Sequence, residues 1–357
     1  MTGPGPCPPE RASETTKLLN RVLREGHPPT LREEYPLVFR EENAQNNRVV
    51  IEDGRVMSHA AFLPVDFQVD GFDLKLGLIG SVATHPDAQG RGHGSAVLTA
   101  CEEGIRDLGG SVAILWSEDD RFYSARGYVR AGLEDLFVIP TGLLRRRNDR
   151  SGVRPAKPTD VHALTEIHGT LRARAIRPPH DWKALLGIPR MDTLVFERDG
   201  QVVAYACCGK GADFENVVHE WAGPTEEALD LVLEHALRGG RDEIVLLSPP
   251  YTGRIRRVLR ERGIPAHRGA LGMMKIVDAR AFAEQINQFF ATANTPAGEI
   301  EPRPDGTFRV TSAAGVEEMD SAQLLHTVFG SEDEEPEEGR GIQGLPIPLY
   351  LRGLDSV

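Results

Sequence analysis

The turn Gln89-Gly90-Arg91-Gly92-His93-Gly94 lies between an apolar run, Leu76 to Val82, and a segment with helical spacing. That segment carries an apolar residue every three or four positions, at Val97, Cys101, Ile105 and Leu108, before Gly109-Gly110 ends it. A strand, a glycine turn and a helix N-terminus together form an anion site. The first amides of a helix have no partner inside it, its dipole favours negative charge, and glycines let a phosphate approach the backbone.

The turn does not match two common phosphate-binding patterns. It lacks G-x-x-x-x-G-K-[ST], and the residues after Gly94 do not complete G-x-G-x-x-G. It does match Q-x-x-G-x-G, and Val82-Ala83-Thr84-His85-Pro86 precedes it. This combination resembles the pyrophosphate loop of the GNAT superfamily of N-acetyltransferases, which bind acetyl-coenzyme A. A tight turn without a ligand is the alternative interpretation.

The resemblance implies two sets of contacts with acetyl-coenzyme A. The amides from Gly90 to Ser95 would hold the diphosphate, and backbone groups from Val82 to Thr84 would align the pantetheine arm like an added strand. The residues predicted to bind the cofactor are Val82, Ala83, Thr84, Gln89, Gly90, Arg91, Gly92, His93, Gly94 and Ser95.

Length and charge limit the other possibilities. A chain of 357 residues has room for two or three domains. Its formal net charge of -12 argues against nucleic acid as the main partner and suits a cationic substrate. No apolar run approaches the ~18 residues of a membrane helix, and the Pro-rich start, Gly3 to Pro9, has no signal-peptide core. We therefore expect a cytoplasmic protein with no membrane partner.

Neither the cysteines nor the turn histidines suggest a metal site. Cys207 and Cys208 are adjacent, which is not metal-ligand spacing, so we expect reduced thiols. His85 and His93 flank the turn, but neither has a second ligand at metal spacing. The sequence therefore predicts no metal.

Two hairpin signals precede the organising strand. Asp53-Gly54 and Asp70-Gly71 separate runs of strand-forming residues, and each predicts a β-hairpin. Residues 1 to 12 are expected to be disordered, and a helix is expected from Ser13 to Gly26. A short apolar strand, Val112 to Trp116, follows the central helix.

The segment Phe122-Tyr123-Ser124-Ala125-Arg126-Gly127-Tyr128 resembles the F-Y-x-x-x-G-[FY] element of the same superfamily. In that family the tyrosine often protonates the departing thiolate of coenzyme A. A phenol with pKa ~10 is protonated at neutral pH and can donate as charge develops. Tyr123 is therefore the candidate acid, and a core aromatic residue is the alternative.

A weaker copy of this pattern follows the polar segment Arg145 to Pro155. Asp199-Gly200 repeats the hairpin signal, and Gly239-Gly240 repeats the paired glycines. The helix of the copy begins at Gly223-Pro224-Thr225-Glu226-Glu227, where acidic residues would repel a diphosphate. Leu259 stands four residues before Gly263, where the first copy has Tyr123. We interpret the copy as structural, or as one wall of the substrate cleft.

The last 80 residues differ in composition. A helix from Ala281 to Phe290, a hairpin at Asp305-Gly306 and a helix from Ser321 to Phe329 predict a small α+β unit. The acidic run Glu332 to Glu338 predicts a solvated loop, and the apolar stretch Leu345 to Leu354 predicts a docked terminal segment.

Two acetyltransferase-like units followed by a small α+β unit resemble the enhanced intracellular survival family, whose third domain is sterol-carrier-like. The resemblance implies an α+β (mixed α/β) fold with three domains, at residues 1–148, 149–277 and 278–357. In that family the terminal carboxylate sits in the active site and can take the proton of the attacking amine. The carboxylate of Val357 is thus a candidate base, and a surface terminus is the alternative.

These observations predict an N-acetyltransferase that moves an acetyl group from acetyl-coenzyme A to a primary amine of a cationic small molecule or lysine. The base is either the Val357 carboxylate or a water ordered by Glu118. The expected substrate residues are Trp116, Ser117, Glu118, Asp119 and Asp120, although an acidic solvated turn is an alternative. A non-catalytic protein that binds acyl-coenzyme A or a lipid is the rival hypothesis. The acceptor and the oligomeric state, including a homo-oligomer, stay open.

Overall fold

A computed structural model describes residues 2–28, 30–144, 152–292, 298–313, 315–333 and 344–357. The chain contains both helices and strands throughout, and the predicted α+β (mixed α/β) fold class is confirmed. Most of the predicted polar linker, the residues on either side of the first predicted domain boundary, and the acidic run beyond Asp333 lie outside the described residues.

The first unit builds its sheet from two consecutive hairpins that lead into the organising strand, which then pairs in parallel with a later strand. Its strands are β1 (Thr2–Pro6), β2 (Asn47–Glu52), β3 (Arg55–Val69), β4 (Phe72–Thr84), β5 (Val112–Leu115) and β6 (Val129–Pro140). Its α-helices are α1 (Ala12–Leu23), α2 (Leu31–Glu34), α3 (His93–Asp107) and α4 (Asp120–Ser124). The predicted hairpins at Asp53-Gly54 and Asp70-Gly71 are both confirmed. The prediction of a disordered start is wrong, because β1 pairs with β2.

Two helices cover opposite faces of the first unit. Neighbouring residues of a strand point to opposite faces, so Val49 and Val50 of β2 mark the two sides. Val50 packs with Val97 and Cys101 of α3, whereas Val49 packs with Leu18 of α1. The first unit is therefore a sheet held between α1 and α3.

The second unit repeats this layout. Its strands are β7 (Val153–Pro155), β8 (Ala173–Ala175), β9 (Asp192–Arg198), β10 (Gln201–Lys210), β11 (Asp213–Ala222), β12 (Glu243–Ser248) and β13 (His267–Ile276). Its α-helices are α5 (Val161–Gly169), α6 (Pro179–Leu185), α7 (Thr225–Arg238) and α8 (Gly253–Glu261). Here β9 and β10 form the hairpin predicted at Asp199-Gly200.

The two units share one sheet because each contributes its last strand to the other. Within the described residues the strand order is β1-β2-β3-β4-β5-β13-β6-β12-β11-β10-β9-β7, with β8 paired to β3. Strand β13 of the second unit pairs with β5, and β6 of the first unit pairs with β12. The two strands also pair with each other. Hydrogen bonding thus continues from one unit into the next.

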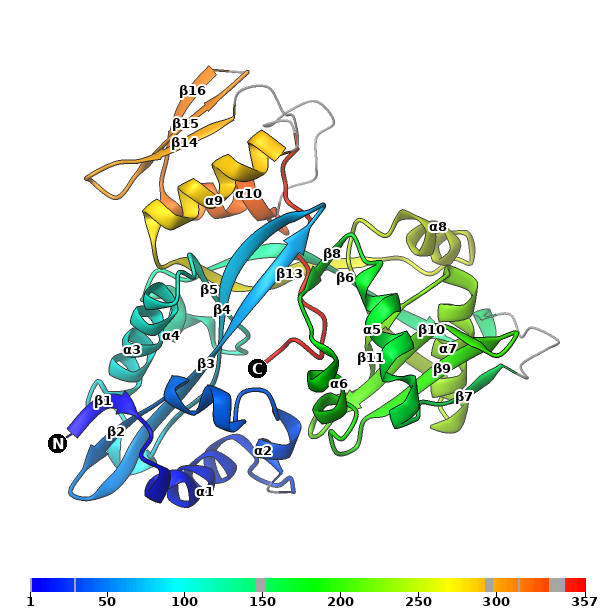
Figure 1. The fold of residues 1–357 in the computed structure, drawn as a ribbon, viewed down its shortest axis with the longest axis horizontal. Helices are drawn as coiled ribbons and strands as arrows, with labels where there is room; N and C mark the ends of the chain where they lie inside the picture. Colours follow the sequence, from blue (N-terminus) through cyan, green and yellow to red (C-terminus); the bar gives the residue numbers. More distant parts are fainter. Residues whose placement is uncertain (1, 29, 145–151, 293–297, 314, 334–343) are drawn as a thin grey trace.

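A third unit lies above the shared sheet in Figure 1, with its helices between the two sheets. It consists of α9 (Ala279–Thr292), β14 (Glu299–Pro302), β15 (Phe308–Ser312), β16 (Gly315–Met319) and α10 (Ser321–Phe329). Its strands form a separate antiparallel sheet. Aromatic residues fill its interior, and Phe289 packs edge-on against Phe72 of β4 with ring centroids 5.6 Å apart.

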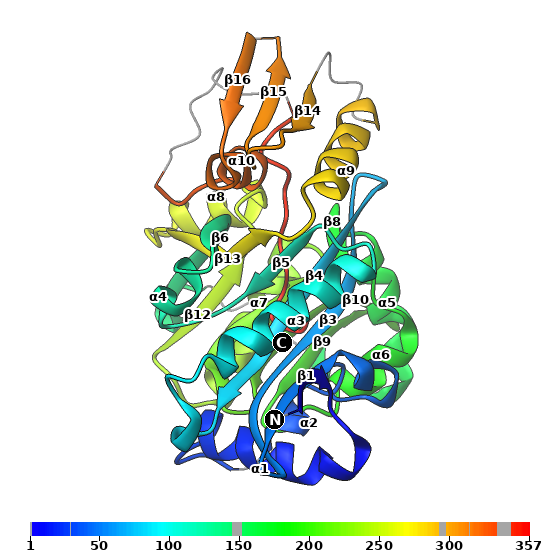
Figure 2. The same cartoon turned by 90° about the vertical axis from the view of Figure 1, so that its left-hand side faces the viewer.

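The chain ends between the first two units, as both views show (Figures 1 and 2). Residues 349–355 run through the interior as a tail without helix or strand, and residues 353–355 form a turn. Leu349, Tyr350, Leu351 and Leu354 are buried, which confirms the predicted docked segment. No described helix is long and apolar enough to cross a membrane.

Candidate active site

The glycine turn leads directly into α3, as the sequence predicts. Gly90 and Gly92 have φ values of +76° and +80°, which side-chain-bearing residues rarely adopt. A Cβ added at either glycine would have no heavy atom within 4 Å, so the turn faces open space. Gly92 is the N-cap of α3, and the first turn of this helix has neither an acidic residue nor a side-chain cap. Its first amides are therefore available to an anion.

The end of the turn is packed tightly against its neighbours. A Cβ at Gly94 would lie 3.2 Å from Thr84 Oγ1 and 3.5 Å from Phe122 Cζ, so a larger residue would push these groups apart. Arg126 of the segment after α4 donates to Ser95 Oγ through Nε at 3.0 Å. The turn, the end of β4 and α4 are thus joined at one point.

Other side chains of the turn are held at its rim. Arg91 Nη1 lies 3.1 Å and His93 Nε2 lies 3.4 Å from Glu52 Oε2. Gln89 is exposed. Among the described residues no group of three His, Cys, Asp or Glu side chains could hold a metal ion.

Strand β4 leaves its neighbour β5 before it reaches the turn. The parallel pairing covers only Leu76 to Leu78 on β4. A bulge follows at Ser81, which has a φ of +53°, while Ala83 and Thr84 remain paired with β3 on the other edge. The β5-facing edge from Val82 to Thr84 is thus past the end of the β4–β5 pairing, where a ligand arm can run alongside.

A cavity of about 490 Å³ lies beside this gap and unites the candidate substrate residues with the chain terminus. It is lined by Trp116, Ser117, Glu118 and Asp120 after β5, by Arg130 and residues 270–273 of the exchanged strands, and by Tyr35, Asp213, Phe214, Ser356 and Val357. The second unit thus forms one wall of the cavity, which is one of the two interpretations that the sequence left open. Asp119 does not line it, because its carboxylate accepts from the Arg121 amide and caps α4.

The terminal carboxyl group lies directly against the bulge of β4. A Cβ at Gly80 would fall 2.4 Å from the carboxyl carbon of Val357 and 2.5 Å from its oxygen. Only a glycine leaves room for the terminus at this position. The structure therefore places the Val357 carboxylate in the cavity, beside the strand that leads into the glycine turn.

The acidic groups of the cavity differ in their partners. Asp120 is paired with Arg130 Nε at 2.5 Å, and Asp213 with Arg24 Nη2 at 2.8 Å. Exposed Glu118 has no ion-pair partner among the described residues. Trp116 forms an apolar wall, and its Nε1 donates to Leu271 O at 2.7 Å. Among the carboxylates of the cavity, those of Glu118 and the terminus therefore have their negative charge least compensated by nearby cations.

Tyr123 lies on α4, next to the glycine turn, and is not among the residues that line the cavity. Its ring is half-buried between Phe122 and Tyr128, with centroids 5.0 Å and 5.9 Å away. Burial raises the pKa of the Tyr123 phenol, so the group keeps its proton at neutral pH. It is a protonated donor beside the turn rather than a wall of the cavity.

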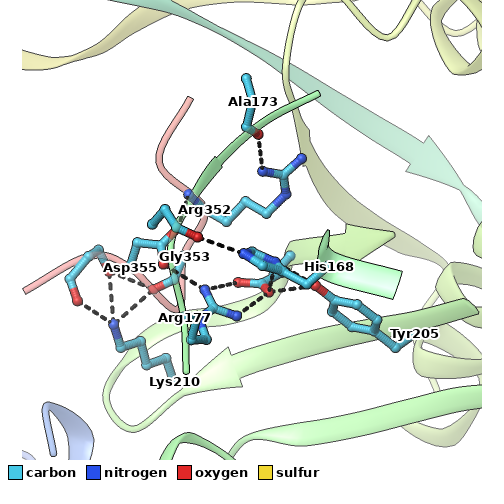
Figure 3. A network of polar contacts seen from close by, with 11 residues as sticks. His168, Ala173, Arg177, Tyr205, Lys210, Arg352, Gly353 and Asp355 are labelled. Atoms are coloured by element: carbon cyan, nitrogen blue, oxygen red, sulfur yellow. Dashed lines mark hydrogen bonds and ion pairs between the residues drawn. The ribbon is translucent and has the colours of Figure 1, made fainter. Parts of the chain in front are cut away.

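Sequence reasoning missed the charged network that fixes the tail. Figure 3 shows Arg352, Gly353 and Asp355 of the tail among His168, Arg177, Tyr205 and Lys210 of the second unit. The only signal in the sequence was the presence of Arg352 and Asp355 at the end of an apolar stretch.

Comparison with known proteins agrees with this geometry. Residues 8–131 match the acetyltransferase (GNAT) domain, a span that contains β2 to β5, the glycine turn and α4. This match makes the chain an acyltransferase. No curated protein sequence matches the chain.

Several solved structures share the fold over most of their length. A GCN5-related N-acetyltransferase from Anabaena variabilis is 14% identical, with 91% of this chain and 89% of that chain covered and a TM-score of 0.66. Eis1 from Mycobacterium abscessus is 16% identical, with 91% and 89% covered and a TM-score of 0.61. N-myristoyltransferase from Saccharomyces cerevisiae, with bound myristoyl-CoA, is 10% identical, with 75% and 79% covered and a TM-score of 0.50. At these identities the likeness shows the fold.

Proposed function

We propose that the chain transfers the acetyl group of acetyl-coenzyme A to a primary amine of a cationic small molecule or a lysine. One observation carries the proposal. The Val357 carboxylate shares a cavity with Trp116 and Glu118 and touches Gly80 of β4, the strand that precedes the glycine turn. A phosphate-binding turn, an open strand edge and a proton acceptor thus meet at the end of β4.

The first unit supplies the donor site in this proposal. The amides from Gly90 to Ser95 hold the diphosphate of acetyl-coenzyme A, because the turn is open and no acidic side chain occupies the first turn of α3. The edge from Val82 to Thr84 aligns the pantetheine arm as an added strand would. The thioester is then directed toward the cavity. When both reactants are held in place, the reaction no longer pays the entropy cost of their encounter. This gain accounts for much of the rate enhancement.

The chemistry requires two proton transfers to or from protein groups and one to solvent. The Val357 carboxylate takes a proton from the acceptor ammonium, and the freed amine nitrogen attacks the thioester carbonyl carbon. A C–N bond forms and the C–S bond breaks, the departing thiolate takes the proton of the Tyr123 hydroxyl, and the new amide nitrogen releases its remaining extra proton to solvent. Solvent then returns the proton from the carboxyl group to the phenolate. Burial raises the pKa of Tyr123, so its hydroxyl carries a proton when the thiolate leaves.

The cavity suits an acceptor with positive charge. Glu118 is exposed at its mouth without an ion-pair partner in the described chain, and Trp116 offers an apolar wall beside it. Asp119 and Asp120 add to the negative field, although Asp120 is paired with Arg130. The chain then comprises two acetyltransferase-like units, at residues 1–148 and 149–277, and a sterol-carrier-like unit at residues 278–357.

Free thiol released from acetyl-coenzyme A tests the proposal. The full chain is offered polyamines, aminoglycosides and lysine peptides, with neutral sugars and thiols as controls. We expect thiol release that depends on a cationic amine, and a mass gain of one acetyl group on the acceptor. Myristoyl-coenzyme A, offered in parallel, tests whether the donor is acetyl rather than a long acyl chain.

A C-terminal extension tests the base. Two added glycines move the carboxylate away from Gly80, and we expect a roughly 100-fold loss of kcat, the usual scale for a lost general base, with unchanged coenzyme A affinity. Coenzyme A binding without transfer to any amine would instead support the non-catalytic hypothesis.

A further inference from the structure

The tail that carries the terminal carboxylate is fixed by charged groups inside the protein. Arg177, of the segment after β8, donates from Nη1 to Glu220 Oε1 at 2.7 Å and from Nη2 to Asp355 Oδ1 at 2.6 Å (Figure 3). The other oxygen of Asp355 accepts the Arg352 amide at 3.1 Å. All four residues are buried. The charges of Arg177, Glu220 and Asp355 compensate one another, and the Arg352 guanidinium donates to Ala173 O at 3.2 Å. This network fixes the chain two residues before its end.

Lys210 continues the network up to the last peptide bond. It is the final residue of β10 and is 1% exposed. Its Nζ donates to Gly353 O at 2.8 Å, to Ser356 O at 2.7 Å and to Ser356 Oγ at 2.9 Å. An ammonium group has three protons, and here all three are directed at the tail. No carboxylate of the described chain lies within ion-pair distance of Lys210.

Burying the charge of Lys210 costs free energy, and the contacts with the tail are what offset it. Burial lowers the pKa of Lys210 to about 7, because the charged form is removed from water. The face of the Tyr35 ring lies 4.5 Å from Nζ and stabilises the ammonium, which offsets part of the free-energy cost of burial. A methionine of similar volume would fill the same space without a charge to bury. The polar contacts of Lys210 therefore point to a role in holding the last residues.

We propose that Lys210 is a positioning residue, which fixes the Ser356–Val357 peptide so that the terminal carboxylate points into the cavity toward the acceptor amine. Ser356 O belongs to the last peptide bond of the chain, so its orientation determines where the carboxylate lies. The inference rests on the proposed function. The inference also assigns a role to the second unit, which holds the tail through Lys210, Arg177 and Glu220.

The test separates positioning from stability through the kinetic constants. Lys210→Met removes the three donors and keeps the volume. We expect kcat to fall about 10-fold to 100-fold, as misplaced catalytic groups do, while the KM for acetyl-coenzyme A and its dissociation constant change less than about 2-fold. Carboxypeptidase should release Val357 faster from this variant than from the natural chain.

A matched control and a tail-side variant complete the experiment. Lys275→Met removes a partly buried lysine that also faces an aromatic ring but makes no contact with the tail, and its kcat should stay unchanged. Ser356→Ala removes one of the three acceptors and should lower kcat about 3-fold. Should Lys210→Met fail to fold, Lys210→Gln, which keeps an amide donor, takes its place with an intermediate loss expected.

The outcomes distinguish the inference from the proposed function. A folded Lys210 variant with natural kcat overturns the inference, as does an equal loss in Lys275→Met. If the C-terminal extension lowers kcat and Lys210→Met does not, the carboxylate remains the base and only the positioning role fails. If neither change lowers kcat, the base is not Val357 and both proposals fall.

Discussion

The first and second units differ at the place where their parallel strands separate. In the first unit β4 and β5 pair only up to Leu78, and the gap beyond leads to the cavity. In the second unit β11 and β12 pair at Val217 and Val218, and Trp221 Nε1 then donates across the strands to Leu247 O at 3.1 Å. In the second unit, buried Trp221 therefore closes the gap between the strands that is open at the corresponding place in the first unit.

The helices that follow also differ in charge. The first turn of α3 has no acidic residue, whereas α7 begins with Glu226 and Glu227 after Pro224. Glu227 is paired with Arg198, and Leu259 is buried where the first unit has Tyr123. The first unit thus has an open cleft, whereas the second unit is closed at the corresponding place and holds the tail.

The largest expected effect tests the glycine turn. Gly92→Asp places a negative charge at the N-cap of α3, and aspartate tolerates the positive φ, so the fold should persist. We expect coenzyme A affinity to fall at least ~100-fold, because the charge repels the diphosphate. Equilibrium binding measures it.

Gly92→Asn is the matched control, with the same shape and no charge, and should lose only about 5-fold. Equal losses in both variants would show that backbone strain rather than charge is responsible. Glu226→Gln, at the corresponding helix start of the second unit, should leave affinity unchanged.

Tyr123→Phe tests the acid that the second unit lacks. Without the hydroxyl the thiolate must leave unprotonated, so we expect kcat to fall about 30-fold, within the usual range for a lost general acid. Coenzyme A affinity should hold, and Phe122 and Tyr128 should keep the ring in place. Stopped-flow thiol release gives kcat. An unchanged kcat would make Tyr123 a packing residue.

The histidines at the two bulges predict a dependence of stability on pH. His59 Nδ1 lies 2.8 Å from Ser81 O in the first unit, and His219 Nε2 lies 3.0 Å from Gly209 O in the second. Burial lowers the pKa of each to about 4, below the ~6.5 of an unfolded chain. Their contribution is complete above pH ~6.5 and is lost as the pH falls toward 4, because only the unfolded chain takes up the protons.

Each histidine should add a slope of about 1.4 kcal/mol per pH unit between these limits, which is tenfold in the unfolding constant. His219→Gln should therefore flatten the stability profile by about that slope, and His59→Gln by a similar amount. Urea unfolding at a series of pH values measures it. A slope that neither substitution changes would mean that both side chains are protonated in the folded protein.

The smallest expected effect concerns the acceptor. Glu118→Gln removes the exposed, unpaired carboxylate of the cavity mouth, and we expect the KM of a cationic acceptor to rise about 3-fold at low salt with kcat unchanged. Glu284→Gln, on the exposed face of α9, is the control. If the KM stays unchanged in Glu118→Gln, or rises equally in Glu284→Gln, then Glu118 does not belong to the substrate site.

Local patterns in the sequence predicted the parts that local physics determines. Glycine turns, hairpin dipeptides and apolar spacing identified β4, the glycine turn and α3, because each depends on residues close in the chain. The exchange of β6 and β13 could not be read, since strand pairing between distant segments leaves no local signature. Lys210 looked like any lysine at the end of a strand, 146 residues before Ser356. The predicted domain boundaries stay predictions.

Titration of the pure full-length chain with coenzyme A in a calorimeter tests the central claim most directly. The account predicts uptake of one molecule per chain, bound at the glycine turn of the first unit and lost in Gly92→Asp. An absence of binding, two molecules per chain, or uptake that survives Gly92→Asp would contradict it.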